Sequence, residues 1–419
     1  MRHWSVDSPH LYACKAIVSV DANGAEYSHV ADFGIRSLRV ADASLLLNDA
    51  PVRLAGANRV EGHPQFGGLE PATLVDLDLG MMKRAHFELQ RLQHYPPSEE
   101  ILDWADRNGM LIIAEAPCWG LTPPELSDER YRDNFRRQLT EMIEAAWNHP
   151  SVVGWSVGNE YHAWTPEGVE WTKTFVDLAH RLDPTRPTTY AALGYDVSQP
   201  VANKEDRGMH WVDFISVNLY SSGKGSGSAL DKIHALWPEK PILVSEYGQR
   251  ADQSSEAARI RNFREMLAAV RYRDFVMGLS YWSFNDYRSR YPGGDPTGHR
   301  PWGIVKADRT PRELYHVMQS ELSPAVLTIV QESPLLVRVE ARPDFPRMPL
   351  KGQRLEVRDS EGAVLHSIAL PDILPGSGRN FDCGKVAASN IRLVGATGFT
   401  CAELVVAQST DSDATSSER

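Results

Sequence analysis

The sequence lacks the features of membrane-spanning, disulfide-rich and nucleic-acid-binding proteins. It has no apolar run long enough to cross a bilayer. Its four cysteines lie far apart and match no zinc-finger spacing. The net charge of -11 argues against a nucleic-acid partner, because phosphate binding needs a positive surface. The N-terminus also lacks the apolar segment of a signal peptide, so we expect a cytoplasmic globular protein with reduced thiols.

The length of 419 residues exceeds what one hydrophobic core usually fills, so two or three domains are expected. Residues 1–43 alternate in the manner of β-strands over Leu11–Val18 and Phe33–Val40, and Asn23-Gly24 is the expected turn between them. Two or three strands cannot form a stable sandwich alone. This segment therefore either packs on the next domain or belongs to a larger one.

In residues 44–321 short apolar runs alternate with helical segments such as Asn134–Trp147. This alternation predicts an α/β fold, and eight such units match a (β/α)8 TIM barrel, which typically has about 250 residues. An open doubly wound sheet is the alternative, but no glycine-rich phosphate-binding sequence follows an early strand. The expected strands are Val52–Ala57, Phe87–Arg91, Leu111–Ala114, Val152–Val157, Thr188–Ala192, Phe214–Val217, Ile242–Ser245 and Met277–Trp282.

Helical spacing stops after the expected barrel. Residues 322–406 contain strand-like runs separated by proline, glycine and aspartate, which predicts a small C-terminal β-sandwich. Residues 407–419 have no side chain large enough to pack and are expected to be a disordered tail. The strand-like runs are Ala325–Ala341, Arg354–Val357, Ala363–Leu370 and Ile391–Val394.

Two of the apolar runs end abruptly in a glutamate. Trp155–Asn159 leads to Glu160, and Ile242–Ser245 leads to Glu246. A TIM barrel presents its functional side chains at the carboxyl ends of the strands. Two facing carboxyl groups are the minimum needed to break a glycosidic bond, with one attacking the anomeric carbon and the other, protonated, releasing the aglycone. The sequence therefore predicts glycoside hydrolysis.

Several short stretches follow one another along the chain in a specific order. They are Phe33–Arg36, Gly56–Arg59, His94–Pro96, Asn148–Ser151, Asn159-Glu160 and Ser245–Gly248. With these stretches in this order, most of residues 1–320 resemble glycoside hydrolase family 2, the β-galactosidase, β-glucuronidase and β-mannosidase group. The resemblance implies that Glu160 is the general acid/base and Glu246 the nucleophile. Burial near a second carboxylate would raise the pKa of the acid, as that role requires.

The resemblance also implies neighbours for the two glutamates. Asn159 matches the residue that hydrogen-bonds the sugar 2-hydroxyl, and Tyr220 matches a tyrosine that hydrogen-bonds the nucleophile. Arg91 stands where the family has an arginine beside the nucleophile, where its positive charge would keep Glu246 ionised.

Three further residues follow barrel strands and are candidates for sugar binding. His94 is expected to bond a ring hydroxyl, and Trp282 to form the floor of the sugar subsite. Asp286 is expected to reach the sugar, with helix capping as its alternative role. The large β-galactosidases hold magnesium near the third strand, but here Glu115 is followed by Ala116–Trp119, which offers poor ligands for a hard cation. We therefore expect no metal and no cofactor.

The identity of the sugar depends on where the sequence departs from the family. The β-glucuronidases recognise the uronate carboxylate through an asparagine and a lysine after the eighth strand, whereas this sequence has Gly298–Gly303. Because that pair is missing, an exo-acting β-galactosidase is favoured. A β-glucuronidase-like hydrolase is the alternative, since Arg300 can bind a carboxylate bidentately.

The resemblance further implies a jelly-roll sugar-binding domain and a complete immunoglobulin-like sandwich before the barrel, and residues 1–43 match only the last strands of that sandwich. A non-catalytic carbohydrate-binding remnant is therefore a second hypothesis. The expected partner is a small-molecule glycoside or oligosaccharide, with no nucleic acid and no membrane. A homo-oligomer is also possible.

Overall fold

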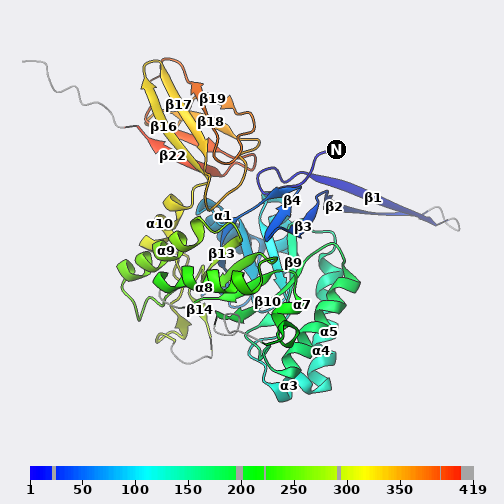
Figure 1. Ribbon diagram of the computed structural model, residues 1–419. Coiled ribbons are helices and arrows are strands. Elements are labelled where there is room, and N and C mark those ends of the chain that lie inside the picture. The colour runs from blue at the N-terminus through cyan, green and yellow to red at the C-terminus, as the bar shows by residue number, and fades with distance from the viewer. Residues whose placement is uncertain (21–24, 195–201, 221–222, 290–293, 387, 407–419) are drawn as a thin grey trace, which may run out of the picture. The chain divides into compact units, whose positions relative to one another are not determined.

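The computed structural model describes residues 1–20, 25–194, 202–220, 223–289, 294–386 and 388–406 (Figure 1). The expected turn at Asn23-Gly24 and the expected tail at 407–419 lie outside these ranges. The chain forms two compact units. The first comprises Met1–Ser323 with Asp344–Met348, and the second comprises Pro324–Pro343 and the chain from Pro349 onward.

The first unit contains a closed barrel of parallel strands in the order β10-β11-β12-β13-β6-β7-β8-β9. The expected TIM barrel is therefore confirmed, with each strand at its expected place. The barrel strands are buried along almost their whole length. This explains their sequences, because strands that are covered on both faces consist of continuous runs of apolar residues. Their bounds are β6 (Leu54–Asn58), β7 (Leu89–Leu92), β8 (Leu111–Glu115), β9 (Val152–Asn159), β10 (Thr188–Leu193), β11 (Ile215–Asn218), β12 (Ile242–Glu246) and β13 (Val276–Trp282).

Helices follow the strands and surround the barrel (Figure 1). The expected helix at Asn134–Trp147 is the greater part of α4. It buries one face, including Phe135, Leu139 and Met142, at the three- and four-residue spacing of an amphipathic helix. The helices are α1 (Ala72–Arg84), α2 (Glu99–Asn108), α3 (Pro123–Ser127), α4 (Glu129–Ala146), α5 (Pro166–Leu182), α7 (Gly208–Trp211), α8 (Gly223–Leu236), α9 (Glu256–Arg271) and α10 (Glu313–Glu321), with a 3-10 turn at Lys204–Asp206.

The N-terminal segment packs on the barrel. Trp4, Val6, Leu45 and Leu47 share a core with side chains from the first residues of the barrel strands, so the segment covers the end opposite the strands' carboxyl termini. The expected strand Phe33–Val40 is interrupted between Gly34 and Leu38, where the Ile35 carbonyl accepts from the Trp4 N–H and the Arg36 guanidinium donates to the carbonyl groups of Pro150 and Val152. The segment instead forms a hairpin of β1 (Leu11–Val20) and β2 (Ala25–Gly34) and a sheet of β3 (Leu38–Ala41), β4 (Ser44–Leu47) and β5 (Ala50–Pro51).

The second unit consists of two antiparallel sheets, β16-β17-β20 and β19-β18-β21-β22, which share one apolar core. The strand-like run Ala325–Ala341 forms two strands that turn back on each other at Ser333-Pro334, where proline has no N–H to continue a ladder. β20 and β22 were not predicted. The bounds are β16 (Ala325–Glu332), β17 (Leu335–Ala341), β18 (Arg354–Arg358), β19 (Val364–Ala369), β20 (Gly378–Asp382), β21 (Asn390–Val394) and β22 (Thr400–Val405).

Candidate active site

A cavity of about 1540 Å³ opens at the carboxyl ends of the barrel strands. Its lining combines carboxyl groups, aromatic rings and arginines, as expected of a site that binds a polar ligand. Two residues predicted for the site, Arg91 and Asp286, do not line the cavity. The predicted site residues that line it are His94, Asn159, Glu160, Tyr220, Glu246 and Trp282.

Glu246 is the last residue of β12 and is only 4% exposed. Its two carboxylate oxygens accept hydrogen bonds from Arg91 Nη1 at 2.7 Å and from the Tyr220 hydroxyl at 2.6 Å. Burial and the negative charge of Glu246 raise the pKa of Tyr220 well above its usual value, so its hydroxyl remains a donor. Tyr220 as a whole residue is 41% exposed, although its hydroxyl contacts the buried carboxylate.

Glu160 directly follows β9 and has a backbone φ of 49°, in the left-handed region that residues other than glycine rarely adopt. Its N–H donates to the Ala191 carbonyl at 2.8 Å, and its Oε1 accepts from Asn218 Nδ2 at 2.7 Å. Burial and the negative charge of Glu246 raise the pKa of Glu160, while the hydrogen bond from Asn218 opposes this rise. Glu160 therefore keeps its proton to a higher pH than an ordinary glutamate.

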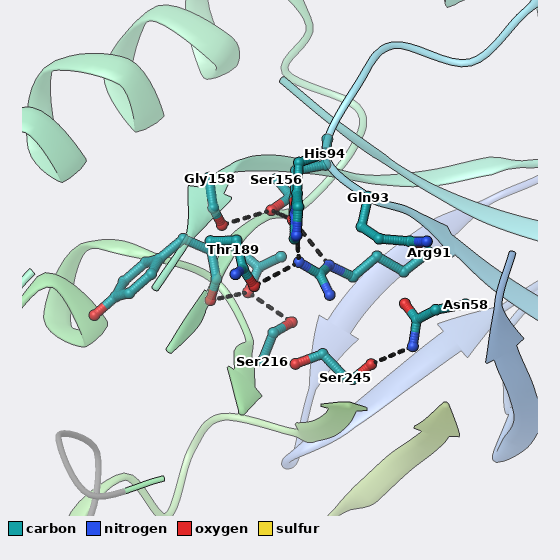
Figure 2. A network of polar contacts seen from close by, with 12 residues as sticks. Asn58, Arg91, Gln93, His94, Ser156, Gly158, Thr189, Ser216 and Ser245 are labelled. Carbon is teal, nitrogen blue, oxygen red and sulfur yellow. Dashed lines mark hydrogen bonds and ion pairs between the residues drawn. The ribbon is translucent and has the colours of Figure 1, made fainter. Parts of the chain in front are cut away.

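Arg91 on β7 is 1% exposed and belongs to a network of polar contacts that also includes His94 (Figure 2). Besides Glu246, its guanidinium donates to Asn159 Oδ1 at 2.7 Å and to both oxygens of Glu115, at 2.8 and 2.9 Å. His94 Nδ1 lies 2.6 Å from Glu115 Oε1. Burial raises the pKa of Glu115, but the positive charge of Arg91 and the hydrogen bond from His94 outweigh it and lower the pKa to about 2. Arg91 is thus held between two buried carboxyl groups.

The surroundings of Glu115 do not suit a divalent cation. Arg91 occupies both of its oxygens, and the Ser156 hydroxyl donates to Oε2 at 2.7 Å. A divalent cation would have to displace this guanidinium to reach the Glu115 carboxylate. Hard metal ions prefer sites in which water and carboxylate oxygens are free to coordinate them. Within the ranges that the structure describes, no group of three or more His, Cys, Asp or Glu side chains is placed to hold a metal ion.

Asn218, at the end of β11, is a site residue that sequence reasoning missed. The Ser245 hydroxyl donates to its Oδ1 at 2.7 Å, which orients the amide so that Nδ2 faces Glu160 and Asn159. Its position in the sequence could have identified it, because polar residues at the carboxyl ends of barrel strands commonly belong to the active site. Glu115 ends β8 in the same way.

Three aromatic rings stand side by side at the cavity. The His94 ring is nearly parallel to those of Trp119 and Trp282, with centroids 6.0 and 6.1 Å away and planes inclined by 1° and 19°. Trp282 Nε1 donates to the Tyr287 hydroxyl at 3.2 Å. Trp119 was not predicted as a site residue, and the residue is 51% exposed.

Asp286, which was predicted to reach the sugar, takes part in a buried ion pair. Its carboxylate is buried and pairs with the Arg312 guanidinium through distances of 2.7 and 3.1 Å. Oδ1 also accepts from the Gly303 N–H at 2.9 Å. Both oxygens are engaged, and the residue does not cap a helix.

One wall of the cavity is cationic, because Arg250, Arg288 and Arg300 all line it. Arg288 and Arg300 belong to a short ribbon in which β14 (Tyr287–Arg288) pairs with β15 (His299–Arg300). Arg300 Nη1 donates to the Tyr287 hydroxyl at 3.2 Å, and its guanidinium lies 5.9 Å from the centre of the Trp302 ring. Arg250 pairs with Asp252.

A TIM barrel with two neighbouring glutamates at the carboxyl ends of its strands has the architecture of glycoside hydrolases. Within that class, the chain belongs to glycoside hydrolase family 2, since residues 38–325 match the model described as "Glycosyl hydrolases family 2, TIM barrel domain". The resemblance stated from sequence motifs is therefore confirmed.

Relatives in the family differ in the sugar that their names give. A β-glucuronidase of Paenibacillus borealis is 28% identical over 350 residues, which are 76% of this chain and 57% of the relative. A β-galactosidase of Aeromonas hydrophila is 26% identical over 390 residues, 87% of this chain and 36% of the relative. The chain thus spans about half the length of these curated relatives or less.

Among solved structures, a family 2 β-galacturonidase from Eisenbergiella tayi bound to galacturonate is similar with a TM-score of 0.69 and 28% identity, covering 76% of this chain and 59% of the other. The similar proteins therefore include named uronidases and galactosidases, and the family alone does not select the sugar. None of the helices among the described residues combines the length and the apolar character needed to cross a bilayer.

Proposed function

We propose that the chain hydrolyses β-linked glycosides by a retaining double displacement, with Glu246 as nucleophile and Glu160 as general acid/base. The observation that carries this proposal is the contrast between the two carboxyl groups. Glu246 accepts hydrogen bonds on both oxygens, whereas burial and the charge of Glu246 raise the pKa of Glu160. Such a pair, held in contrasting environments, is how one site performs nucleophilic and acid chemistry at the same pH.

In the first step a Glu246 oxygen attacks the anomeric carbon as Glu160 gives its proton to the glycosidic oxygen. The bond to the aglycone breaks, and a covalent glycosyl-enzyme remains. Glu246 has then lost the negative charge that raises the pKa of Glu160. In the second step the ionised Glu160 takes a proton from water, whose oxygen attacks the anomeric carbon and releases Glu246.

Neighbouring side chains hold the sugar and the nucleophile in this scheme. The Asn159 Oδ1 is occupied by Arg91 and Asn218, so its Nδ2 is the atom offered to the sugar 2-hydroxyl. Tyr220 and Arg91 fix the Glu246 carboxylate. His94 and Trp282 form an aromatic side of the subsite, where the apolar face of a sugar can pack.

A β-galactoside is the favoured substrate, because the family's uronate-binding asparagine and lysine are missing from Gly298–Gly303. The cationic wall supports a second candidate, a β-linked uronic acid, because guanidinium groups bind carboxylates bidentately. Arg300 is the residue we assign to that carboxylate.

A panel of 4-nitrophenyl β-glycosides tests the proposal. Galactoside, glucuronide, galacturonide and mannoside are offered to the wild type, to Glu246→Gln and to Arg300→Gln. Turnover of one of them that is lost in Glu246→Gln, with the fold intact, supports the enzyme. If only uronide turnover falls in Arg300→Gln, the second candidate is correct. Saturable binding of sugar without turnover would support the non-catalytic remnant instead.

A further inference from the structure

Trp119 lies on the loop after β8, beside the proposed acid/base. Its position is fixed by β9: the Asn159 N–H donates to the Cys118 carbonyl at 2.7 Å, and the Gly120 N–H donates to the Asn159 carbonyl at 3.0 Å. Gly158 allows this close approach, since at its φ of 138° a Cβ atom would lie 2.8 Å from the Cys118 carbonyl oxygen. The indole is therefore held next to the residue that precedes Glu160.

Trp119 also lines the cavity. The residue is 51% exposed although it lines a concave site, and the parallel His94 ring lies 6.0 Å from its own. A large exposed aromatic surface in a binding cleft is a platform for a flat apolar group, because covering it removes apolar area from water.

The backbone contacts of the two tryptophans indicate on which side of the scissile bond this platform lies. The Trp282 backbone N–H donates to the Tyr247 carbonyl at 2.8 Å, next to the proposed nucleophile, whereas Trp119 is held beside Asn159, next to the proposed acid. The general acid must face the glycosidic oxygen, and the group beyond that oxygen is the aglycone. Trp282 thus belongs to the sugar side, and Trp119 to the side of the acid.

We propose that Trp119 is the platform of a leaving-group subsite that takes a flat apolar face, either an aromatic ring or the apolar face of a second sugar. This inference rests on the proposed function, because the leaving-group side is defined by Glu160 acting as the acid. Trp119 selects the aglycone and takes no part in the chemistry.

The test compares Trp119→Ala with the wild type on three substrates that share the sugar accepted in the glycoside panel: the 4-nitrophenyl glycoside, a disaccharide and the glycosyl fluoride. The fluoride has no flat leaving group. Loss of one stacking contact lowers kcat/KM by about 3- to 10-fold for the nitrophenyl glycoside, the disaccharide or both. The fluoride changes by less than about 2-fold, since it makes no such contact.

Two variants serve as controls. Trp119→Phe keeps a stacking surface and retains most of the activity on the affected substrate. Trp147→Ala removes an indole of similar exposure, 46%, that does not line the cavity, and it changes none of the three reactions.

A loss confined to the nitrophenyl glycoside identifies an aromatic aglycone, and a loss confined to the disaccharide identifies a second sugar. An equal loss of kcat/KM on the glycosyl fluoride would place Trp119 on the sugar side. Unchanged kcat/KM on all three substrates would show that Trp119 does not bind the leaving group. Either result overturns the inference. If the wild type turned over no substrate at all, the proposed function would fail instead.

Discussion

Replacing Arg91 by methionine tests the buried network beneath the site. Arg91 lies between the carboxyl groups of Glu115 and Glu246, and all three side chains are buried. Methionine keeps much of the volume but removes the positive charge. The two carboxyl groups then face each other without a cation, and breaking a buried pair in this way costs about 3–5 kcal/mol of unfolding free energy.

The structure gives a second measure of this magnitude. The pKa of Glu115 is lowered from 4.5 to about 2, against the opposing effect of burial, chiefly by Arg91 and then by His94. A depression of this size corresponds to about 3 kcal/mol of stability. Because the folded-state pKa is depressed, this stability is fully present above pH 4.5 and is lost as the pH falls toward 2. The loss of unfolding free energy in Arg91→Met is therefore expected to be larger at pH 7 than at pH 4.

Urea unfolding followed by tryptophan fluorescence measures the effect. All eleven tryptophans precede Pro324, so the signal reports the first unit alone. The double variant Arg91→Met with Glu115→Gln recovers most of the stability but not the activity, because Glu246 still lacks its partner. Arg136→Met, which removes an exposed arginine paired with Asp133, is the control and costs less than about 0.5 kcal/mol. A loss below about 1 kcal/mol in Arg91→Met, or no recovery in the double variant, would refute the reasoning.

Two further changes separate catalytic from structural residues. Asn218→Ala removes the hydrogen bond that opposes the rise in the pKa of Glu160. The basic limb of the kcat/KM–pH profile is therefore expected to move to higher pH. A basic limb that stays in place or moves to lower pH would contradict the assignment of Glu160 as the acid. Asp286→Asn weakens the buried ion pair with Arg312 and is expected to lower the unfolding free energy by about 2 kcal/mol without changing KM. A raised KM at unchanged stability would instead support a contact between Asp286 and the sugar.

The sequence was sufficient for the barrel because each strand is a short apolar run between a helix and a loop. Buried parallel strands need no alternation, so β8 and β12 are legible as Leu111–Glu115 and Ile242–Glu246. The same pattern identified the two glutamates as candidates, because each of these apolar runs leads to an ionisable residue. The run Ala325–Ala341 was not divided into its two strands, although the polar residues Gln331–Ser333 and the following Pro334 mark the turn between them.

Contacts between strands could not be read from the sequence. Asn218 and Glu160 lie 58 positions apart and meet only because β9, β10 and β11 are neighbours in one barrel. The ion pair of Asp286 could not be read from the sequence either, because its partner, Arg312, comes from the start of a later helix. Trp119 was overlooked because nothing in the sequence shows that its indole stays exposed.

Trapping the glycosyl-enzyme tests the proposed reaction most directly. A 2-deoxy-2-fluoro glycoside of the accepted sugar, with a good leaving group, forms the covalent intermediate but hydrolyses slowly. Mass spectrometry of the digested protein is then expected to find one sugar on the peptide that contains Glu246, and none in Glu246→Gln. Turnover of substrate without any covalent adduct, or an adduct on another residue, would contradict Glu246 as the nucleophile of a retaining hydrolase.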